Sequence, residues 1–127
     1  MSDLLTLAQT VAAQAYAPYS KYQVGCALET TTGRIFTGCN VENASYGLTI
    51  CAERNAVFHA VAEEGAGMKI VRATVVCLGH EFPPCGACRQ VLAEFSLPGG
   101  ATEITFLRDG KPLTMTIAEL LPESFAL

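Results

Sequence analysis

The segments Cys51-Ala52-Glu53 and Pro84-Cys85-Gly86-Ala87-Cys88 decide how this chain is organised, because together they offer three thiols and one carboxylate. If the CxxC pair opens a helix, its two sulfurs lie on one face of the first turn, close enough to share an ion. Structural zinc sites usually have four Cys or His ligands, whereas catalytic sites have three protein ligands and an open fourth position. Three cysteines and a nearby glutamate therefore favour a catalytic zinc site, provided that the fold brings Cys51 to the other two.

Each of the two segments is expected to lie at the N-terminus of a helix. Cys51 and Glu53 are two positions apart and would diverge inside a helix, but at a helix start both side chains can project past the end. The unpaired N–H groups and the positive end of the helix dipole also favour thiolate over thiol. Two helix ends are therefore predicted to point at one metal ion.

The charge of such a site needs compensation. Three thiolates bound to Zn²⁺ leave a net charge of −1, which weakens the ion as a Lewis acid and raises the pKa of its water. Arg54 lies three positions after Cys51 on the same expected helix, so its guanidinium can reach the sulfurs. We predict that Arg54 partly neutralises the thiolates.

The order CAE followed by PCxxC is a recognised signature of the zinc nucleobase deaminases. Further segments extend the likeness to nearly the whole chain, which resembles the small homotetrameric cytidine deaminases. The segments that carry this resemblance, in order, are Tyr19-Ser20-Lys21-Tyr22-Gln23-Val24-Gly25, Gly38-Cys39-Asn40-Val41-Glu42-Asn43-Ala44, Cys51-Ala52-Glu53-Arg54, Pro84-Cys85-Gly86-Ala87-Cys88-Arg89-Gln90-Val91 and Leu120-Leu121-Pro122.

The resemblance implies an α/β fold, a three-layer α/β/α sandwich around a mixed five-stranded sheet, with residues 1–127 forming one domain. It also implies a hydrolase of pyrimidine salvage with one Zn²⁺ per subunit, which uses water to convert cytidine and 2′-deoxycytidine to uridine and 2′-deoxyuridine. Cys51, Cys85 and Cys88 would bind the zinc. Glu53 would carry protons from water to N3 of the base and to the departing ammonia. The N–H of Ala52 can hold O2 of the base.

The segment Asn40-Val41-Glu42 follows an expected strand, so alternation should direct both polar side chains to one side. In the resembling family these two residues bind the ribose hydroxyls, which suits a carboxylate acceptor beside an amide that can donate and accept. The alternative is an Asx turn with no ligand. Blasticidin-S deaminases share the metal segments but lack this carboxylate, so Glu42 favours a nucleoside substrate.

Three aromatic residues complete the pocket that the resemblance implies. Tyr22 occupies the position of a ring stacked on the pyrimidine, although it can equally be an ordinary core ring. Tyr46 lies in a segment that contacts another subunit in the family. Phe125 resembles a ring that covers the pocket of a neighbouring subunit, whereas a disordered tail is the default for a C-terminus.

Hydrophobic periodicity and turn residues predict the elements of the fold. A first helix, capped by Ser2-Asp3, should end before Pro18, and a buried helix should run from Cys51 to about Glu64. The apolar run over 72–79 suits a central strand covered on both faces and predicts a βαβ unit. The remaining expected elements are strands at 24–28, 35–37, 104–107 and 113–116, a helix from Cys85 that stops at Pro98, and a short helix at 117–121.

Composition bounds the partners of the chain. Half of the residues are hydrophobic and 16% are charged, so one small domain leaves apolar surface exposed and an oligomer is expected. The net charge is −4 and the basic residues are scattered, which favours a free nucleoside over nucleic acid. No basic leader precedes an apolar stretch, and no apolar run approaches the roughly 20 residues of a membrane span, so we expect a cytoplasmic protein that contacts no membrane.

Other cysteines and histidines are given structural roles. Cys26, Cys39 and Cys77 are expected to pack as small hydrophobic residues in a reducing compartment, without disulfides. His59 lies two turns into its helix and His80 follows a strand, so neither is expected to bind metal.

Two rival functions remain open. One is a structural zinc module, in which the three cysteines and a fourth ligand only stabilise the fold. The other is a deaminase of the same fold that acts on a different aminopyrimidine, such as blasticidin S or a cytosine in nucleic acid.

Overall fold

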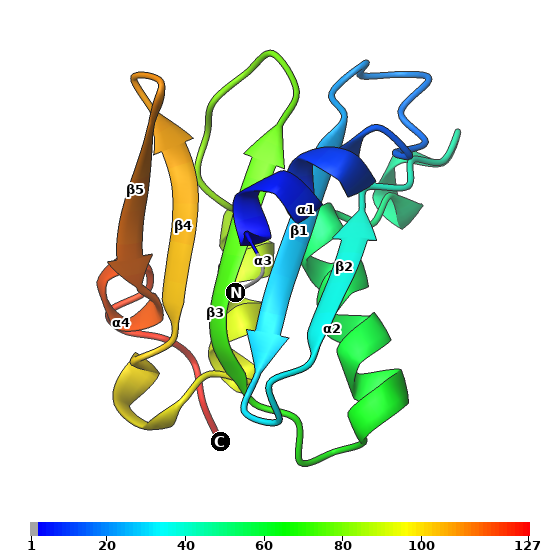
Figure 1. Ribbon diagram of the computed structural model, residues 1–127. Coiled ribbons are helices and arrows are strands. Elements are labelled where there is room, and N and C mark those ends of the chain that lie inside the picture. The colour runs from blue at the N-terminus through cyan, green and yellow to red at the C-terminus, as the bar shows by residue number, and fades with distance from the viewer. Residues whose placement is uncertain (1–2) are drawn as a thin grey trace.

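The structure, a computed structural model, describes residues 3–127. Four helices and five strands follow one another along the chain (Figure 1). In chain order they are α1 (Leu4–Ala12), β1 (Val24–Thr30), β2 (Ile35–Cys39), α2 (Ala52–Glu64), β3 (Ile70–Cys77), α3 (Gly86–Glu94), β4 (Glu103–Arg108), β5 (Lys111–Thr116) and α4 (Ile117–Leu120). Short 3₁₀ turns occur at Tyr46–Leu48 and Pro98–Gly100.

Every predicted helix and strand is present, with small shifts at the ends. Asp3 caps α1 by accepting a hydrogen bond from the Leu5 N–H at 3.0 Å, while Ser2, the other expected cap residue, lies outside the described residues. The helix α1 ends at Ala12, well before Pro18, because the chain then pairs through Tyr16 with Val41. None of the helices in residues 3–127 has the length and hydrophobicity that a membrane crossing requires.

The five strands form one mixed sheet in the order β2-β1-β3-β4-β5. The strands β3 and β4 are parallel, and the other neighbouring pairs are antiparallel. The helix α2 joins two parallel strands, β2 and β3, that have β1 between them, and α3 joins the neighbouring parallel strands β3 and β4. The prediction of a mixed five-stranded sheet with β3 at its centre is confirmed.

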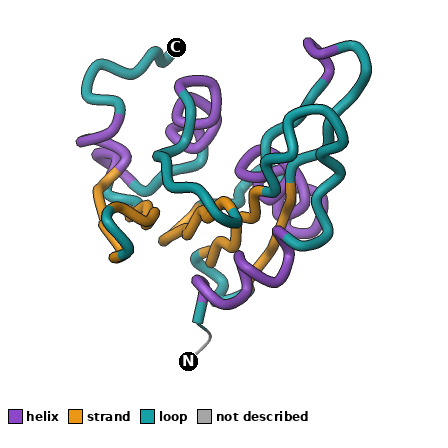
Figure 2. Tube along the Cα trace, turned by 90° about the horizontal axis from the view of Figure 1, so that it is seen from above, coloured by secondary structure: helices purple, strands orange, loops and turns teal. Residues whose placement is uncertain are grey.

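Helices cover both faces of the sheet, as predicted for a three-layer sandwich. The helix α1 lies on one face, and α2 and α3 lie on the other (Figure 2). Alternation along β1 serves both layers, since Cys26 and Leu28 pack in the core beneath α2 and α3, while Ala27 packs against α1 with Val76.

This topology brings two helix starts to one edge of the sheet. The strands β2 and β3 run in the same direction, and each is followed by a helix that returns antiparallel to it. The carboxyl ends of such strands are where ligand sites form in open α/β sheets. The starts of α2 and α3 therefore lie near one another at the carboxyl ends of β2 and β3, with the N-terminal end of β1 between them.

The helix α2 is less buried than its apolar sequence predicts. Its inner side, which includes Ala56 and Val57, is fully buried, but Phe58 is 49% exposed and His59 is also exposed. The reason is that α2 packs on the sheet and on α3 only, so its outer face has no neighbour within residues 3–127. His59 lies near the Thr37 carbonyl oxygen, with 3.2 Å between Nδ1 and that oxygen.

A glycine sets how closely α2 approaches β2. A Cβ at Gly38 would lie 2.3 Å from the backbone nitrogen of Ala56 and 2.8 Å from the carbonyl oxygen of Ala52, distances that real Cβ atoms do not adopt. The backbones of helix and strand therefore touch directly at this point, and Gly38 has no tolerance for a side chain.

We predict that Gly38→Ala destabilises the protein by about 1–3 kcal/mol, the usual cost of overpacking, because α2 must move off the sheet. Gly67→Ala is the matched control, since a Cβ there meets no atom within 4 Å. Thermal unfolding of both variants, followed by circular dichroism, measures the difference. Equal unfolding temperatures for the two variants would show that the contact tolerates expansion.

Candidate active site

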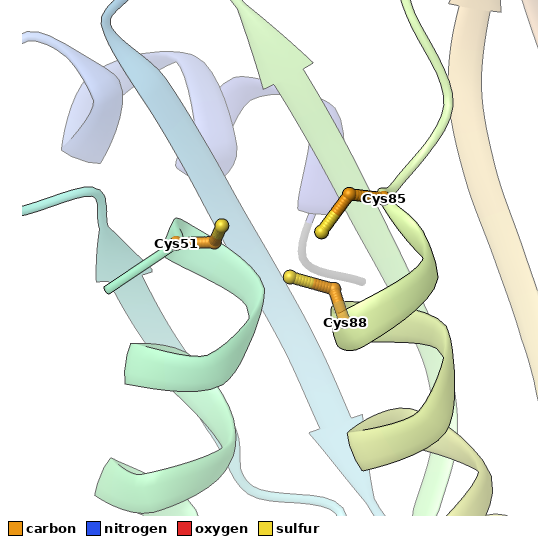
Figure 3. A group of neighbouring side chains, drawn as sticks. All are labelled: Cys51, Cys85 and Cys88. Atoms are coloured by element: carbon orange, nitrogen blue, oxygen red, sulfur yellow. The ribbon is translucent and has the colours of Figure 1, made fainter. Parts of the chain in front are cut away.

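Three cysteine sulfurs meet where α2 and α3 begin. Cys51 is the N-cap of α2, Cys85 is the N-cap of α3, and Cys88 lies in the first turn of α3. Their Sγ atoms all lie within 4.8 Å of one another, and Figure 3 shows them pointing toward a common centre. Neither N-cap side chain accepts a capping hydrogen bond, so both sulfurs are free to face this centre. The structure thus brings together the three residues expected to bind metal.

The ionisation of these thiols is strongly linked. The pKa of Cys51 is lowered to about 5, chiefly by a hydrogen bond with Cys88; burial opposes this shift and Arg54 adds to it. The same hydrogen bond raises the pKa of Cys88, which is fully buried. Without a cation the cluster therefore holds a thiolate at Cys51 stabilised by a proton on Cys88, because three thiolates this close repel one another.

The donor set fits a zinc ion. Soft thiolates in a tetrahedral arrangement are ligands that zinc prefers, and its charge permits all three sulfurs to ionise together. Within residues 3–127, the cluster includes no fourth Cys, His, Asp or Glu. Three protein ligands with one position left over is the arrangement of catalytic zinc sites.

Arg54 makes the contact that its spacing predicts. Its Nη2 donates to the Cys51 Sγ at 3.3 Å, and this hydrogen bond to Cys51 is the main cause that raises the Arg54 pKa. The Arg54 Nε is buried and has no hydrogen-bond partner among the described residues. The guanidinium is therefore held against the sulfurs and places a positive charge beside them.

A cavity opens directly beside the sulfurs. Its walls are mostly apolar, and its polar members come from three different segments of the chain. The lining residues are Val24, Asn40, Thr49, Cys51, Ala52, Glu53, Phe82, Pro83 and Cys85. The cavity combines apolar walls with a few polar groups, which is typical of a site for a small molecule.

Glu53 lies in the first turn of α2 and reaches this cavity with only 4% of its surface exposed. The pKa of Glu53 is raised to about 7, chiefly by burial; the negative charge of Cys51 acts in the same direction, and Arg54 opposes the shift. A carboxyl group with a pKa near neutrality can both accept and donate a proton, which is what a general acid and base requires. Ala52, which precedes it, is the first residue of α2, so its N–H has no acceptor inside the helix.

Asn40 anchors the chain at the edge of the cavity. Its Oδ1 accepts from the Val24 N–H at 2.9 Å, and its Nδ2 donates to the Tyr22 carbonyl oxygen at 2.8 Å. Asn40 therefore bridges to the entry of β1 and does not form the Asx turn considered as an alternative. An amide nitrogen carries two hydrogens, so one N–H of Asn40 remains for another acceptor.

Glu42 lines a second hollow, together with Tyr19, Ser20, Tyr46 and Thr49. Its Oε1 accepts from the Tyr19 and Ser20 N–H groups at 3.0 and 3.1 Å, and its Oε2 accepts from the Ser20 hydroxyl. The Ser20 hydroxyl is the main cause that lowers the Glu42 pKa. Thr49 lines both hollows, so Asn40 and Glu42 lie in neighbouring spaces.

The aromatic residues are placed less simply. Tyr22 is 45% exposed, so it is not the core ring considered as an alternative, and its ring meets His80 edge-on at 4.7 Å and Phe82 at 6.1 Å. Phe82 itself lines the cavity and is the aromatic residue that sequence reasoning missed. Its one signal was its place directly before Pro83, in the loop that leads to Cys85.

Tyr46 and Phe125 are among the most exposed large side chains, at 76% and 70%. The ring of Tyr46 packs edge-on against Tyr19, with 5.9 Å between centroids. The Phe125 carbonyl accepts from Gln90 Nε2 at 3.0 Å, which holds the C-terminal segment while its ring faces outward.

Comparison with known proteins agrees with this geometry. Residues 1–99 match the family described as the cytidine and deoxycytidylate deaminase zinc-binding region. A cytidine deaminase of Sporosarcina psychrophila is 46% identical over 115 residues, which cover 89% of this chain and 82% of that protein. The chain belongs to the cytidine and deoxycytidylate deaminase zinc-binding family.

Solved structures show the same fold. The crystal structure of cytidine deaminase from Burkholderia pseudomallei superposes with a TM-score of 0.87 at 41% identity, covering 98% of this chain and 100% of that chain. The corresponding structure from Mycobacterium tuberculosis gives a TM-score of 0.84 at 40% identity, covering 98% and 95%. The similarity spans both layers of helices and the whole sheet.

We predict that Arg54→Ala weakens zinc binding roughly 10- to 100-fold, the range found when partners of metal ligands are removed. The cause is loss of the cation that favours the Cys51 thiolate. Competition with a chromophoric chelator measures the zinc affinity. Arg34→Ala is the control. It removes the same charge, but away from the site, since Arg34 pairs with Glu63 on the surface at 3.2 Å. If both variants bind zinc equally well, Arg54 does not act on the thiolates.

Proposed function

We propose that this protein is a zinc-dependent cytidine deaminase, which converts cytidine and 2′-deoxycytidine to uridine and 2′-deoxyuridine by hydrolysis. The observation that carries the proposal is the joint placement of three sulfurs and one buried carboxyl group at a single cavity. The sulfurs lie within 4.8 Å of one another, and Glu53 lines the same cavity as Cys51 and Cys85. The names of the related proteins support the choice of substrate.

Cys51, Cys85 and Cys88 would hold one zinc ion per subunit. When bound, zinc supplies Lewis acidity that lowers the pKa of water and so makes a nucleophile available at neutral pH. Arg54 offsets part of the excess negative charge of the three sulfurs, and the helix ends of α2 and α3 add their positive dipoles.

Glu53 moves the protons of the reaction. It takes a proton from the attacking water and delivers it to N3 of the ring while oxygen adds at C4. It then takes the proton of the hydroxyl now on C4 and gives it to the amino group, so that C4 becomes a carbonyl carbon and the C4–N bond breaks to release ammonia. The burial that raises the Glu53 pKa to about 7 suits a group that must accept and release protons in one cycle.

The rest of the substrate meets groups that still have hydrogen-bonding capacity. The Ala52 N–H can donate to O2 of the base. The remaining N–H of Asn40 and the Oε2 of Glu42 can bind ribose hydroxyls, one as a donor and the other as an acceptor. Tyr22, behind Phe82, can complete the apolar wall beside the ring.

The structural zinc module explains the site less well. It requires a fourth ligand, and within residues 3–127 the cluster supplies only three. It also gives no reason for a buried carboxyl group facing a cavity, which costs free energy unless it has a function. A deaminase acting on blasticidin S would share the metal site but would not need Glu42 beside a hollow.

We further propose a homotetramer that acts in pyrimidine salvage in the cytoplasm. The support is the set of large apolar side chains that a single chain leaves exposed, among them Tyr46, Leu48 and Phe125. In such an assembly Tyr46 and Phe125 would reach the pocket of a neighbouring subunit.

The direct test is an ultraviolet assay of cytidine with the purified protein. We expect the absorbance change of deamination with cytidine and 2′-deoxycytidine, its loss after treatment with a strong chelator, and its return when zinc is added. Cytosine and blasticidin S serve as comparison substrates. Turnover of blasticidin S without turnover of cytidine would favour the rival deaminase, and no turnover of any of them would favour the structural module.

Glu53→Gln separates catalysis from metal binding. The amide keeps the size of the side chain but cannot carry protons, so we expect kcat to fall at least 10²- to 10⁴-fold with zinc content unchanged. Glu63→Gln, on the exposed side of the same helix, is the control. Retained cytidine deamination by Glu53→Gln would exclude Glu53 as the proton carrier.

A further inference from the structure

Arg89 follows Cys88 in α3 and joins the metal-binding segment to the C-terminal part of the chain. Its Nε donates to the Pro84 carbonyl oxygen at 2.8 Å, and its Nη1 donates to the Leu120 carbonyl oxygen at 2.9 Å. Pro84 and Leu120 are buried, and Arg89 is half-buried. Both hydrogen bonds therefore lie partly out of water, where a charged donor binds a carbonyl strongly.

The Pro84 carbonyl belongs to the peptide unit that leads into Cys85. A peptide unit is planar, so a bond to its oxygen also fixes the direction in which the Cα of Cys85 follows. The next carbonyl, that of Cys85, accepts from the Arg89 backbone N–H at 2.9 Å. One residue thus holds the peptide units on both sides of Cys85.

Cys85 depends on this support more than the other two cysteines do. It is exposed, whereas Cys88 is buried and Cys51 is half-buried and contacts Arg54. Its side chain makes no capping hydrogen bond. The place of its sulfur therefore depends strongly on the backbone on either side of Cys85, which Arg89 holds through the Pro84 and Cys85 carbonyls.

The other end of the bridge is the last turn of α4. The final carbonyls of a helix have no donor inside that helix, so the Leu120 oxygen is available to an external one. The start of α4 is fixed by a capping box between Thr116 and Glu119. Arg89 is therefore hydrogen-bonded to α4, which follows directly after β5. This helix lies outside residues 1–99, the part of the chain that matches the family.

We propose that Arg89 is a positioning residue of the metal site, which orients Cys85 by bridging the Pro84 carbonyl to the end of α4. The inference rests on zinc binding by the three cysteines, as in the proposed function, but not on the identity of the substrate. The neighbouring Gln90 provides a contrast. It also holds the C-terminal segment, through the Phe125 carbonyl, yet none of its described hydrogen bonds reaches the metal-binding segment.

The test compares Arg89→Lys, Arg89→Ala and Gln90→Ala with the unchanged protein. Zinc affinity is measured on the folded, metal-free proteins by competition with a chromophoric chelator, and their unfolding temperatures are measured separately. We expect both Arg89 variants to bind zinc roughly 10- to 100-fold more weakly, since lysine keeps the charge but lacks the planar fork whose separate nitrogens donate to the two carbonyls. Gln90→Ala should bind zinc as the unchanged protein does.

The other outcomes overturn the proposal. If the Arg89 variants unfold at lower temperature but bind zinc as tightly as the unchanged protein, Arg89 only stabilises the packing of α3 and α4. If neither Arg89 variant folds without zinc, Arg89 is needed to stabilise the whole fold and not specifically to orient Cys85. If the unchanged protein binds no zinc, the proposed function fails with it, whereas intact binding in the unchanged protein and in all variants refutes only the role of Arg89.

Discussion

The repulsion between three sulfur atoms is the constraint on which the site depends. They lie within 4.8 Å of one another, closer than three negative charges can remain without a cation. Two helix ends and Arg54 place positive charge beside the sulfurs. Without a cation the pKa of Cys51 is lowered and that of Cys88 is raised, because the two thiols share a hydrogen bond. The same negative charge, together with burial, raises the pKa of Glu53. The clustered sulfurs and the raised pKa of Glu53 are thus two results of one electrostatic arrangement.

The topology of the sheet places these groups together. Because β2 and β3 are parallel but separated by β1, the helices that follow them begin at one edge while their cysteines come from distant parts of the chain. The two cysteine segments need no long loop to meet, since Cys51 and Cys85 are each the N-cap of a helix. The fold therefore determines the distance between the sulfurs, and the local sequence determines only which atoms lie there.

Local patterns in the sequence predicted most of this architecture. Cysteine spacing, helix caps and hydrophobic periodicity are properties of neighbouring residues, and they identified the helix starts at Cys51 and Cys85 and all five strands. Contacts between distant segments could not be predicted in this way. The place of Phe82 in the cavity depends on how the loop after β3 folds back, and the exposure of Phe58 depends on which neighbour α2 lacks. The hydrogen bonds from Arg89 to two separate carbonyls likewise have no signal in the spacing of residues.

The direct contact of α2 with β2 at Gly38 has a consequence for how the enzyme can move. A helix whose backbone touches the strand beneath it cannot slide or tilt without a collision, so Cys51 and Glu53 stay fixed relative to the sheet. A change in the width of the pocket is then expected at the loops that bear Tyr46 and Phe82, whose rings are exposed. We therefore expect the nucleoside to enter, and ammonia to leave, by movement of these outer loops around a fixed centre.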